Sequence, residues 1–336
     1  MFAKLLYDGG IIHVPKEMGN ARPDQLNGSP FDMLVELAGR VCYDSLGTGR
    51  DSVQYHAHLV ESGHTSVHEH AHFTVEVPMK NPRILLELMN RPDLWVTMDF
   101  KRDVLRVTIN LRHLFDWFTM PAVMGSFFYD VFMHHAILLA PNVFRNCEWS
   151  CGVAAMPFLS DTKVVTPAYD TEKFITVYGE CSRVCSHEWV RHRANISQRS
   201  SRYCDESEQP YVTHPLFSML CADDLAEETH QHWKRSRELY SAVVADLQPK
   251  IAGDSARKQA RSAARYYLGN GLGTAMIFTA SVWHWRKIFA QRLNPAADAE
   301  IRTVMGSLLT DLQESRYAAD FTDLSIKSTP TGPILE

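Results

Sequence analysis

The chain has 336 residues, of which 45% are hydrophobic, and its formal net charge at pH 7 is −5. This is enough apolar material for a buried core, and the slightly acidic balance argues against a broadly basic surface that binds nucleic acid polymers. No export signal is recognisable, and no apolar run reaches the roughly 20 residues that a transmembrane helix needs. We therefore expect a globular, cytoplasmic protein that binds neither membranes nor nucleic acid polymers.

The predicted elements, taken in chain order, mix helices with strands. Residues 31–43 have the apolar spacing of an amphipathic helix, and residues 71–77 alternate like a strand. Asn81-Pro82 can start another helix, and the pattern from there to about residue 170 is mixed. Further helices are expected at 173–190, 226–248, 256–267 and 296–312, with a short extended segment at 276–279. No Gly/Ser-rich linker divides the chain, so we expect a single α+β domain over residues 1–336.

One short stretch, residues 190–203, concentrates four arginines, a histidine and three serine hydroxyls. Arg191 and Arg193 would end a predicted helix, where cations offset the helix dipole. That explanation does not extend to Arg199 and Arg202. Guanidinium groups that alternate with hydroxyls are well suited to hold phosphate oxygens through bidentate and neutral hydrogen bonds. The stretch therefore predicts a phosphate-binding site.

Two other patterns raise the possibility of a metal site. The seven cysteines include the pairs Cys147/Cys151 and Cys181/Cys185, although structural zinc sites usually have the tighter C-x2-C spacing. His68, His70 and His72 alternate, and on a strand their rings would share one face, as metal ligands often do. A zinc metallohydrolase is therefore an alternative class of function.

Three blocks of sequence, in order, resemble the motifs of the flavin-dependent thymidylate synthases. Residues 63–74 (GHTSVHEHAHFT) resemble the G-H-x-S/T-x-x-E-H-x-x-F-T element of that family. Residues 191–203 resemble its R-H-R signature followed by Ser-x-Arg-Tyr. Ala264-Arg265-Tyr-Tyr-Leu268, then Arg292 and residues 299–302 (AEIR), resemble its C-terminal pattern.

The resemblance implies a fold of mixed helices around an antiparallel sheet, here with a large insertion at about residues 76–175. It implies C5 methylation of a uracil nucleotide, with methylene-tetrahydrofolate as carbon donor, FAD as redox cofactor and NADPH as reductant. A homotetramer is also implied, because active sites in the family are shared between subunits.

The resemblance also implies roles for individual residues. Arg202 and Arg265 match residues that hold the nucleotide phosphate, and Arg292 matches the residue beside the pyrimidine. Negative charge must build on the ring oxygens before C5 becomes nucleophilic, so Arg292 is expected to be catalytic, together with Ser200. The remaining expected nucleotide contacts are Glu188, Gln198 and Ser201. The expected flavin contacts are His64, Ser66, Glu69, Arg191, His192 and Arg193.

Several positions depart from the family pattern. One residue is missing between Arg193 and Ser200, so either Ser200 or Ser201 can be the signature serine, and the register of Arg202 favours Ser200. Glu188 stands where the family commonly has Gln. The N-A-R triplet of the family, which binds flavin, would fall on residues 281–283, which read SVW here.

Residues 108–118 (TINLRHLFDWF) have the T-x-N-x-R-x-L shape that residues 279–289 lack. This similarity suggests a diverged internal repeat in which Asn110 and Arg112 replace the missing flavin contacts. An ordinary helix start is the alternative, with Asn110 as its cap and Leu114, Phe115 and Phe118 in the core.

The nature of the substrate stays open at this level. Family members of nucleoside-antibiotic pathways methylate ribonucleotides, so a UMP-specific enzyme is an alternative to one that uses dUMP. A catalytically inactive nucleotide-binding relative is a further alternative, given the loss of the Asn and Arg of the N-A-R triplet.

Overall fold

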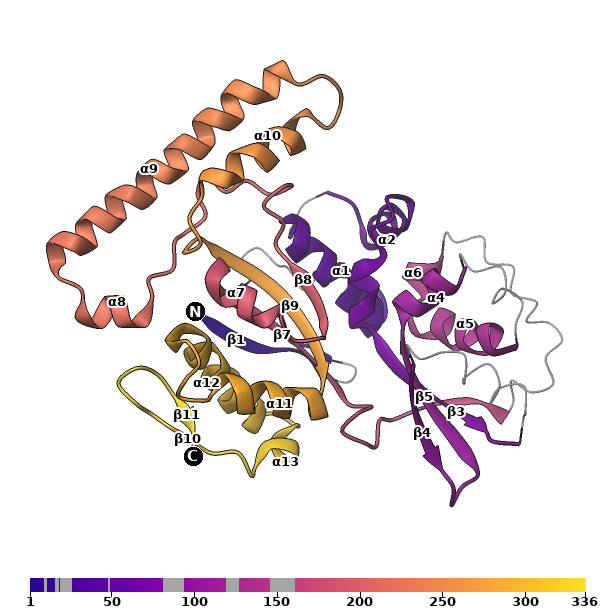
Figure 1. Cartoon of the computed structure of the whole chain (residues 1–336). Coiled ribbons are helices and arrows are strands. Elements are labelled where there is room, and N and C mark those ends of the chain that lie inside the picture. Colours follow the sequence, from indigo (N-terminus) through magenta and orange to yellow (C-terminus); the bar gives the residue numbers. More distant parts are fainter. Residues whose placement is uncertain are drawn as a thin grey trace.

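The computed structural model describes residues 1–8, 11–15, 18, 26–47, 49–80, 94–118, 127–145 and 161–336. Two antiparallel sheets, each covered by helices, form the body of the molecule, and a helical arm projects from it (Figure 1). This architecture confirms the expected α+β fold class.

The larger sheet has five strands in the order β2-β1-β7-β9-β8. These strands are β1 (Phe2–Asp8), β2 (Ile11–Ile12), β7 (Phe174–Ser182), β8 (Asn195–Gln198) and β9 (Gly273–Ser281). One face packs against α7 (Arg183–Trp189), α11 (Val282–Arg292) and α12 (Ala299–Gln313). Neighbouring residues of β9 face opposite sides: Phe278 belongs to this core, and Ile277 belongs to the core on the other face.

The second sheet has the order β4-β5-β3-β6. Its strands are β3 (His72–Pro78), β4 (Trp95–Asp99), β5 (Val104–Asn110) and β6 (Lys163–Val165). It shares a core with the helices α1 (Pro30–Tyr43), α2 (Ser52–Glu61), η3 (Thr65–His70), α4 (Leu111–Phe118), α5 (Phe127–Leu139) and α6 (Pro141–Phe144). The segment expected as an insertion, residues 76–175, thus supplies three strands of this sheet.

The arm consists of α8 (Pro215–Leu220), α9 (Asp223–Leu247) and α10 (Ala256–Ala264), with short 3-10 turns at Gln248–Lys250 and Arg265–Tyr267 (Figure 1). Only Ser236 and Tyr240 of α9 are buried. The chain ends with α13 (Ala318–Phe321) and a small ribbon of β10 (Ile326–Lys327) and β11 (Ile334–Leu335). None of the helices in the described ranges has the length and apolar composition that a membrane span requires.

Four of the expected helices are present in the structure. The helix expected at 31–43 is α1, and Ser29 and Asp32 form a capping box at its start. The helices expected at 226–248, 256–267 and 296–312 correspond to α9, to α10 with its 3-10 turn, and to α12. The helix expected from Asn81-Pro82 lies outside the described residues.

The prediction of one helix over residues 173–190 is wrong in its first half. Residues 174–182 form β7, and only residues 183–189 are helical. The apolar residues of this segment fit a helical period, but the run Ile175-Thr176-Val177 favours a strand that is buried on both faces. Ser182 ends the strand and caps α7, since its hydroxyl accepts a hydrogen bond from Cys185 N. The extended segment expected at 276–279 is likewise part of a longer strand, β9.

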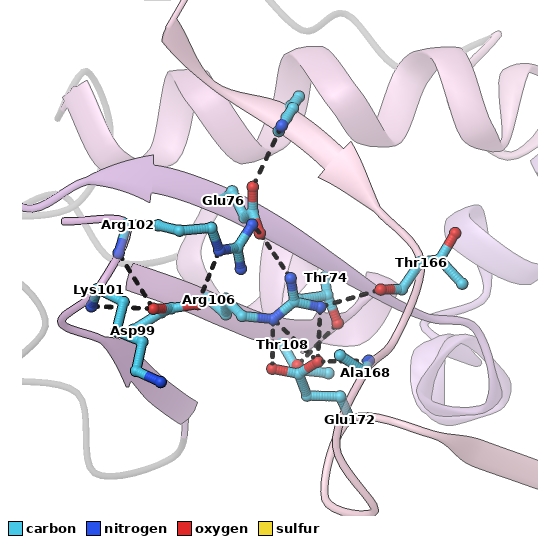
Figure 2. A network of polar contacts seen from close by, with 11 residues as sticks. Thr74, Glu76, Asp99, Lys101, Arg102, Arg106, Thr108, Thr166, Ala168 and Glu172 are labelled. Carbon is cyan, nitrogen blue, oxygen red and sulfur yellow. Dashed lines mark hydrogen bonds and ion pairs between the residues drawn. The ribbon is translucent and has the colours of Figure 1, made fainter. Parts of the chain in front are cut away.

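A buried network of charged side chains ties the two sheets together (Figure 2). The Arg106 guanidinium on β5 donates to Glu76 on β3 at 2.5 Å and to Glu172 at 2.7 Å and 2.8 Å. Glu172 stands two residues before β7 and also accepts from Ala168 N at 3.0 Å. All three charged residues are buried, with exposed fractions of 3% or less. Arg106 therefore fixes the start of β7 against the second sheet.

Replacing Arg106 by Met should strongly destabilise the fold. Removing one partner of a buried ion pair leaves uncompensated charge, which typically costs about 3–5 kcal/mol. Arg102→Met is the matched control, because Arg102 contacts the same Glu76 carboxylate at 2.7 Å from a half-exposed position. Urea unfolding followed by far-UV circular dichroism measures both variants. Equal losses of stability in the two variants would contradict the central role of Arg106.

Candidate functional site

One group of predicted residues lies where the loop after β8 meets η3. The His64 ring stacks on Tyr43 with centroids 4.9 Å apart, and both rings contact the edge or face of Tyr203. Lys258 Nζ lies 4.7 Å and the Arg202 guanidinium 5.7 Å from the centroid of the Tyr203 ring. The first and second sequence blocks are thus brought together here.

The cations of this group are not neutralised by carboxylates. In the described ranges, Arg202, Arg265 and Lys258 form no ion pair, whereas neighbouring arginines do: Arg199 with Glu206 and Asp44, and Arg261 with Asp205. The pKa of His64 is lowered by burial and then by nearby cations, among them Lys258 and Arg202. Uncompensated positive charge fits an anionic ligand such as a phosphate.

The two candidate signature serines have different contacts. Ser201 is buried, and its hydroxyl accepts a long hydrogen bond of 3.5 Å from Arg265 Nη1. Ser200 is half-buried, its N–H donates to Cys42 O at 2.9 Å, and its carbonyl accepts from Tyr203 N and Cys204 N. Ser201, rather than the favoured Ser200, therefore contacts the expected phosphate-binding arginine.

A second group surrounds Arg292 at the end of α11. Its guanidinium donates to Glu188 Oε2 at 2.5 Å, to the Glu188 carbonyl at 2.8 Å and to His192 Nε2 at 2.9 Å. The pKa of His192 is lowered to about 4 by burial and then by Arg292 and His284. His192 is therefore neutral near pH 7, with Nε2 as an acceptor, and Glu188 is the ion-pair partner of Arg292.

A third group lines a cavity of about 450 Å³ between the two sheets. Glu69, Asn110 and Arg112 contribute to its wall, together with Asn195 and Trp95. Asn195 Nδ2 donates to the Glu69 carbonyl and lies 3.2 Å from His72 Nε2. The segment that follows the R-H-R element thus meets the first sequence block at this cavity.

Two carboxylates, those of Asp116 and Glu69, surround the Arg112 guanidinium. Arg112 Nε donates to Asp116 at 2.7 Å, and its Nη1 lies 3.7 Å from Glu69. Burial raises the pKa of Glu69, and Arg112 opposes that shift. Asn110 caps α4, since its Oδ1 accepts from His113 N at 3.2 Å, and Leu114 and Phe115 are buried, as the helix-start interpretation expects.

The remaining predicted residues lie in less enclosed positions. Arg191, Arg193 and Ser66 are exposed. Gln198 lies on β8 and donates to the hydroxyls of Ser186 and Thr274 at 2.9 Å and 3.3 Å. At the position of the missing N-A-R triplet, Ser281 caps α11 and Trp283 is 44% exposed.

Asn195 and Trp95 are cavity residues that the sequence analysis did not single out. Asn195 is two residues beyond the R-H-R element, and this proximity was an available signal. No sequence signal marked Trp95, because its position at the cavity depends on the pairing of β4 with β5.

The three alternating histidines do not share one face, contrary to the strand interpretation. His68 and His70 belong to the 3-10 helix η3 and His72 to β3. His70 bonds the Thr279 and Ser197 hydroxyls at 2.7 Å and 2.9 Å, and the His72 ring stacks on Phe174. His68 packs against Phe115. The described ranges hold no group of three or more His, Cys, Asp or Glu side chains suited to a metal ion. Cys147 and Cys151 lie outside those ranges.

Comparison with known proteins agrees with these motifs. Residues 173–315 match the family model described as "Thymidylate synthase complementing protein". The chain is 34% identical over 156 residues to the flavin-dependent thymidylate synthases of Mycobacterium bovis (strain BCG / Pasteur 1173P2) and Mycobacterium tuberculosis (strain ATCC 25177 / H37Ra), and 33% identical to that of Mycobacterium avium (strain 104). Each match covers 45% of this chain and 61% of the relative.

Residues 173–315 are therefore similar to the thymidylate synthase complementing family, and they contain the second and third of the three sequence blocks. The similarity to the flavin-dependent thymidylate synthases agrees with the resemblance that these blocks carry, and the chain spans 61% of the length of those relatives.

The buried His68 should make stability depend on pH in a defined way. Burial lowers its pKa from 6.5 to about 3. Between these values the unfolded chain binds one more proton at this residue, so the free energy of unfolding falls as pH falls, by about 1.4 kcal/mol per pH unit. His68→Leu removes this contribution.

Urea unfolding at several pH values between 6 and 4.5 measures the two slopes. The variant should show the smaller loss of stability per pH unit, whatever its absolute stability. Identical slopes would mean that folding does not lower the pKa of His68.

Proposed function

We propose that the protein is an FAD-dependent methylase that transfers a one-carbon unit to C5 of a uracil nucleotide. Methylene-tetrahydrofolate is the proposed carbon donor and NADPH the proposed reductant. A bound flavin supplies redox chemistry, since a methylene group must gain two electrons to become a methyl group. The observation that carries the proposal is a group of cations without ion pairs in the described residues. Arg202 and Lys258 lie beside the Tyr203 ring, which contacts the rings of Tyr43 and His64, and Arg265 donates to Ser201, two residues before Tyr203.

The proposed nucleotide site uses these cations for the phosphate. Charge-assisted hydrogen bonds to phosphate are worth about 1.5–3 kcal/mol each, provided that no carboxylate competes for the donors. Ser201, which accepts from Arg265, is a candidate hydroxyl contact, and Ser200 keeps its place as the alternative. Gln198 is a proposed further contact from β8.

Arg292 is proposed as the catalytic cation beside the pyrimidine. Negative charge builds on the ring oxygens as C5 becomes nucleophilic, and a cation fixed nearby stabilises that charge. Glu188 and neutral His192 hold the guanidinium in place through three hydrogen bonds. Because Glu188 neutralises part of the charge, we propose that a ligand rearranges this ion pair when it binds.

The flavin is proposed to contact two sets of residues. His64, Ser66 and the R-H-R element, residues 191–193, form one set. Glu69, Asn110 and Arg112 form the other, at the 450 Å³ cavity, where Asn110 and Arg112 would take over from Ser281 and Trp283. A protein that contains flavin when purified would favour this function over an inactive nucleotide-binding relative.

We further propose a cytoplasmic homotetramer of single-domain subunits. The required nucleotide, folate and NADPH are metabolites of the cytoplasm. Support for assembly comes from large apolar side chains that the arm and its flanking turn expose: Met219 at 51%, Leu220 at 78% and Tyr266 at 83%.

Single-turnover methylation of dUMP and of UMP, with flavin occupancy checked by visible absorption, tests the proposal. Arg292→Ala should lower the rate at saturating nucleotide about 100-fold or more, as the loss of a transition-state donor does, with a smaller effect on nucleotide affinity. Arg292→Lys should recover part of that rate. Arg286→Ala is the matched control, because Arg286 is another arginine of α11 and pairs with Asp323 at the surface.

If Arg292→Ala weakened only nucleotide binding, Arg292 would be a positioning residue. A wild-type protein that purified without flavin and methylated neither nucleotide would overturn the proposed function. The comparison of dUMP with UMP also decides between the thymidylate synthase activity and the UMP-specific alternative.

A further inference from the structure

The two sheets repeat the same arrangement of strands. The order β4-β5-β3-β6 corresponds to β8-β9-β7-β1, and every neighbouring pair is antiparallel. In the first set, Thr108 on β5 lies opposite Thr74 on one side and Trp95 on the other. In the second set, Thr279 on β9 lies opposite Thr176 and Asn195.

Side-chain contacts repeat as well. The Thr74 and Thr108 hydroxyls are 2.9 Å apart, and those of Thr176 and Thr279 are 2.7 Å apart. A helix follows directly after each of the strands β5 and β9. Each helix is capped by the residue two positions after Thr108 or Thr279, which is Asn110 in the first set and Ser281 in the second. Each cap side chain accepts a hydrogen bond from the backbone N–H three residues later.

The two sets also exchange their first strands. β1 precedes β3 in the chain but pairs with β7, and β6 precedes β7 but pairs with β3. Tyr7 and Val165 thereby take equivalent places, opposite Thr176 and Thr74. Such an exchange is the arrangement of two interlocked copies of one unit.

Equivalent residues meet where the two units touch. His72 lies opposite Asn110, and Phe174 lies opposite Ser281, so the two occupy the same place in their units. Their rings stack with centroids 3.6 Å apart and planes 8° apart. A residue contacts its own equivalent only close to the axis that relates two copies. The 450 Å³ cavity is lined by the stacked pair, His72 and Phe174, and by a second pair of equivalent residues, Trp95 and Asn195.

We propose that the chain holds two copies of one unit and that the cavity on their shared axis is a single, asymmetric site for a planar heteroaromatic ring. The first copy supplies Asn110, Arg112 and the aromatic wall Trp95, and the second supplies Asn195. This inference rests on the proposed function, because the ring in question is the isoalloxazine of a flavin. It adds Trp95 and Asn195 to that site, and it accounts for flavin binding without the N-A-R triplet that residues 281–283 lack.

The charges decide which part of a flavin the cavity takes. Arg112 is faced by two carboxylates, Asp116 and Glu69, so the cavity has no excess of positive charge for a diphosphate. A ring needs instead a flat apolar surface and a few amide partners, which Trp95, Asn110 and Asn195 provide. Trp95 is 45% exposed, and its ring lies 6.3 Å from that of Trp283, which in turn carries Lys287 Nζ 3.5 Å from its centroid.

The test compares FAD and riboflavin binding to the full chain, with fluorescence titration for affinity and visible absorption for occupancy. Trp95→Ala should weaken both ligands by a similar factor of about ten, because it removes stacking on the ring and no phosphate contact. Bound flavin should also become more fluorescent, since a stacked tryptophan quenches it. Trp95→Phe should keep most of the affinity.

Phe100→Ala is the matched control. Phe100 is a 79% exposed aromatic residue of the turn between β4 and β5 and does not line the cavity, so its loss should change neither affinity nor fluorescence. If Trp95→Ala bound flavin as tightly as the wild-type protein, with equal fluorescence, the ring site would be overturned. The proposed function would not be affected by that result. A loss of affinity for FAD alone would overturn it too, by placing Trp95 at the phosphates. Wild-type protein that bound neither ligand would overturn both the proposed function and this site.

Discussion

The placement of the buried Arg106 guanidinium is the constraint on which the rest of the molecule depends. Its charge is taken out of water only because Glu76 and Glu172 both accept from it, and these carboxylates belong to different parts of the fold. Glu172 leads directly into β7, so the ion pair fixes where the larger sheet starts relative to the smaller one. Phe174 is then held in position to stack on His72, and the cavity beside that stack keeps its shape.

Charge compensation also divides the candidate site into parts with different chemistry. Among the described residues, Arg202, Lys258 and Arg265 form no ion pair with a carboxylate, and this leaves their donors available to an anion. Arg112 and Arg292 are both paired, and each lies where a ring rather than a phosphate is proposed. The carboxylates thus separate guanidinium groups whose donors stay available to an anion from those that are already paired.

Sequence reasoning succeeded where local signals were sufficient. The helix α1 has a capping box and an apolar stripe, and the arginine-rich segment carries a recognisable signature. It failed at residues 174–182, because a strand buried on both faces has no alternation and can imitate a helical period. The repeat was visible only as three shared residues between 108–118 and 279–289 in the sequence.

Cross-strand register made the repeat plain in the structure. The pairing of Thr108 with Trp95 and of Thr279 with Asn195 depends on residues far apart in the chain, so no local pattern could have identified these two cavity residues. The same limit applied to the ion pair of Arg292 with Glu188. The departure of Glu188 from the family pattern was legible in the sequence, but its partner, 104 residues away, was not.

The central claim is that the flavin ring lies between the two copies of the unit while the nucleotide phosphate lies at the uncompensated cations. A crystal structure of the full chain with FAD and a uracil nucleotide bound tests it most directly. The account predicts the isoalloxazine ring beside Trp95, Arg112 and Asn195, and the nucleotide phosphate beside Arg202 and Arg265. A flavin ring bound elsewhere, with this cavity filled only by solvent, would contradict it.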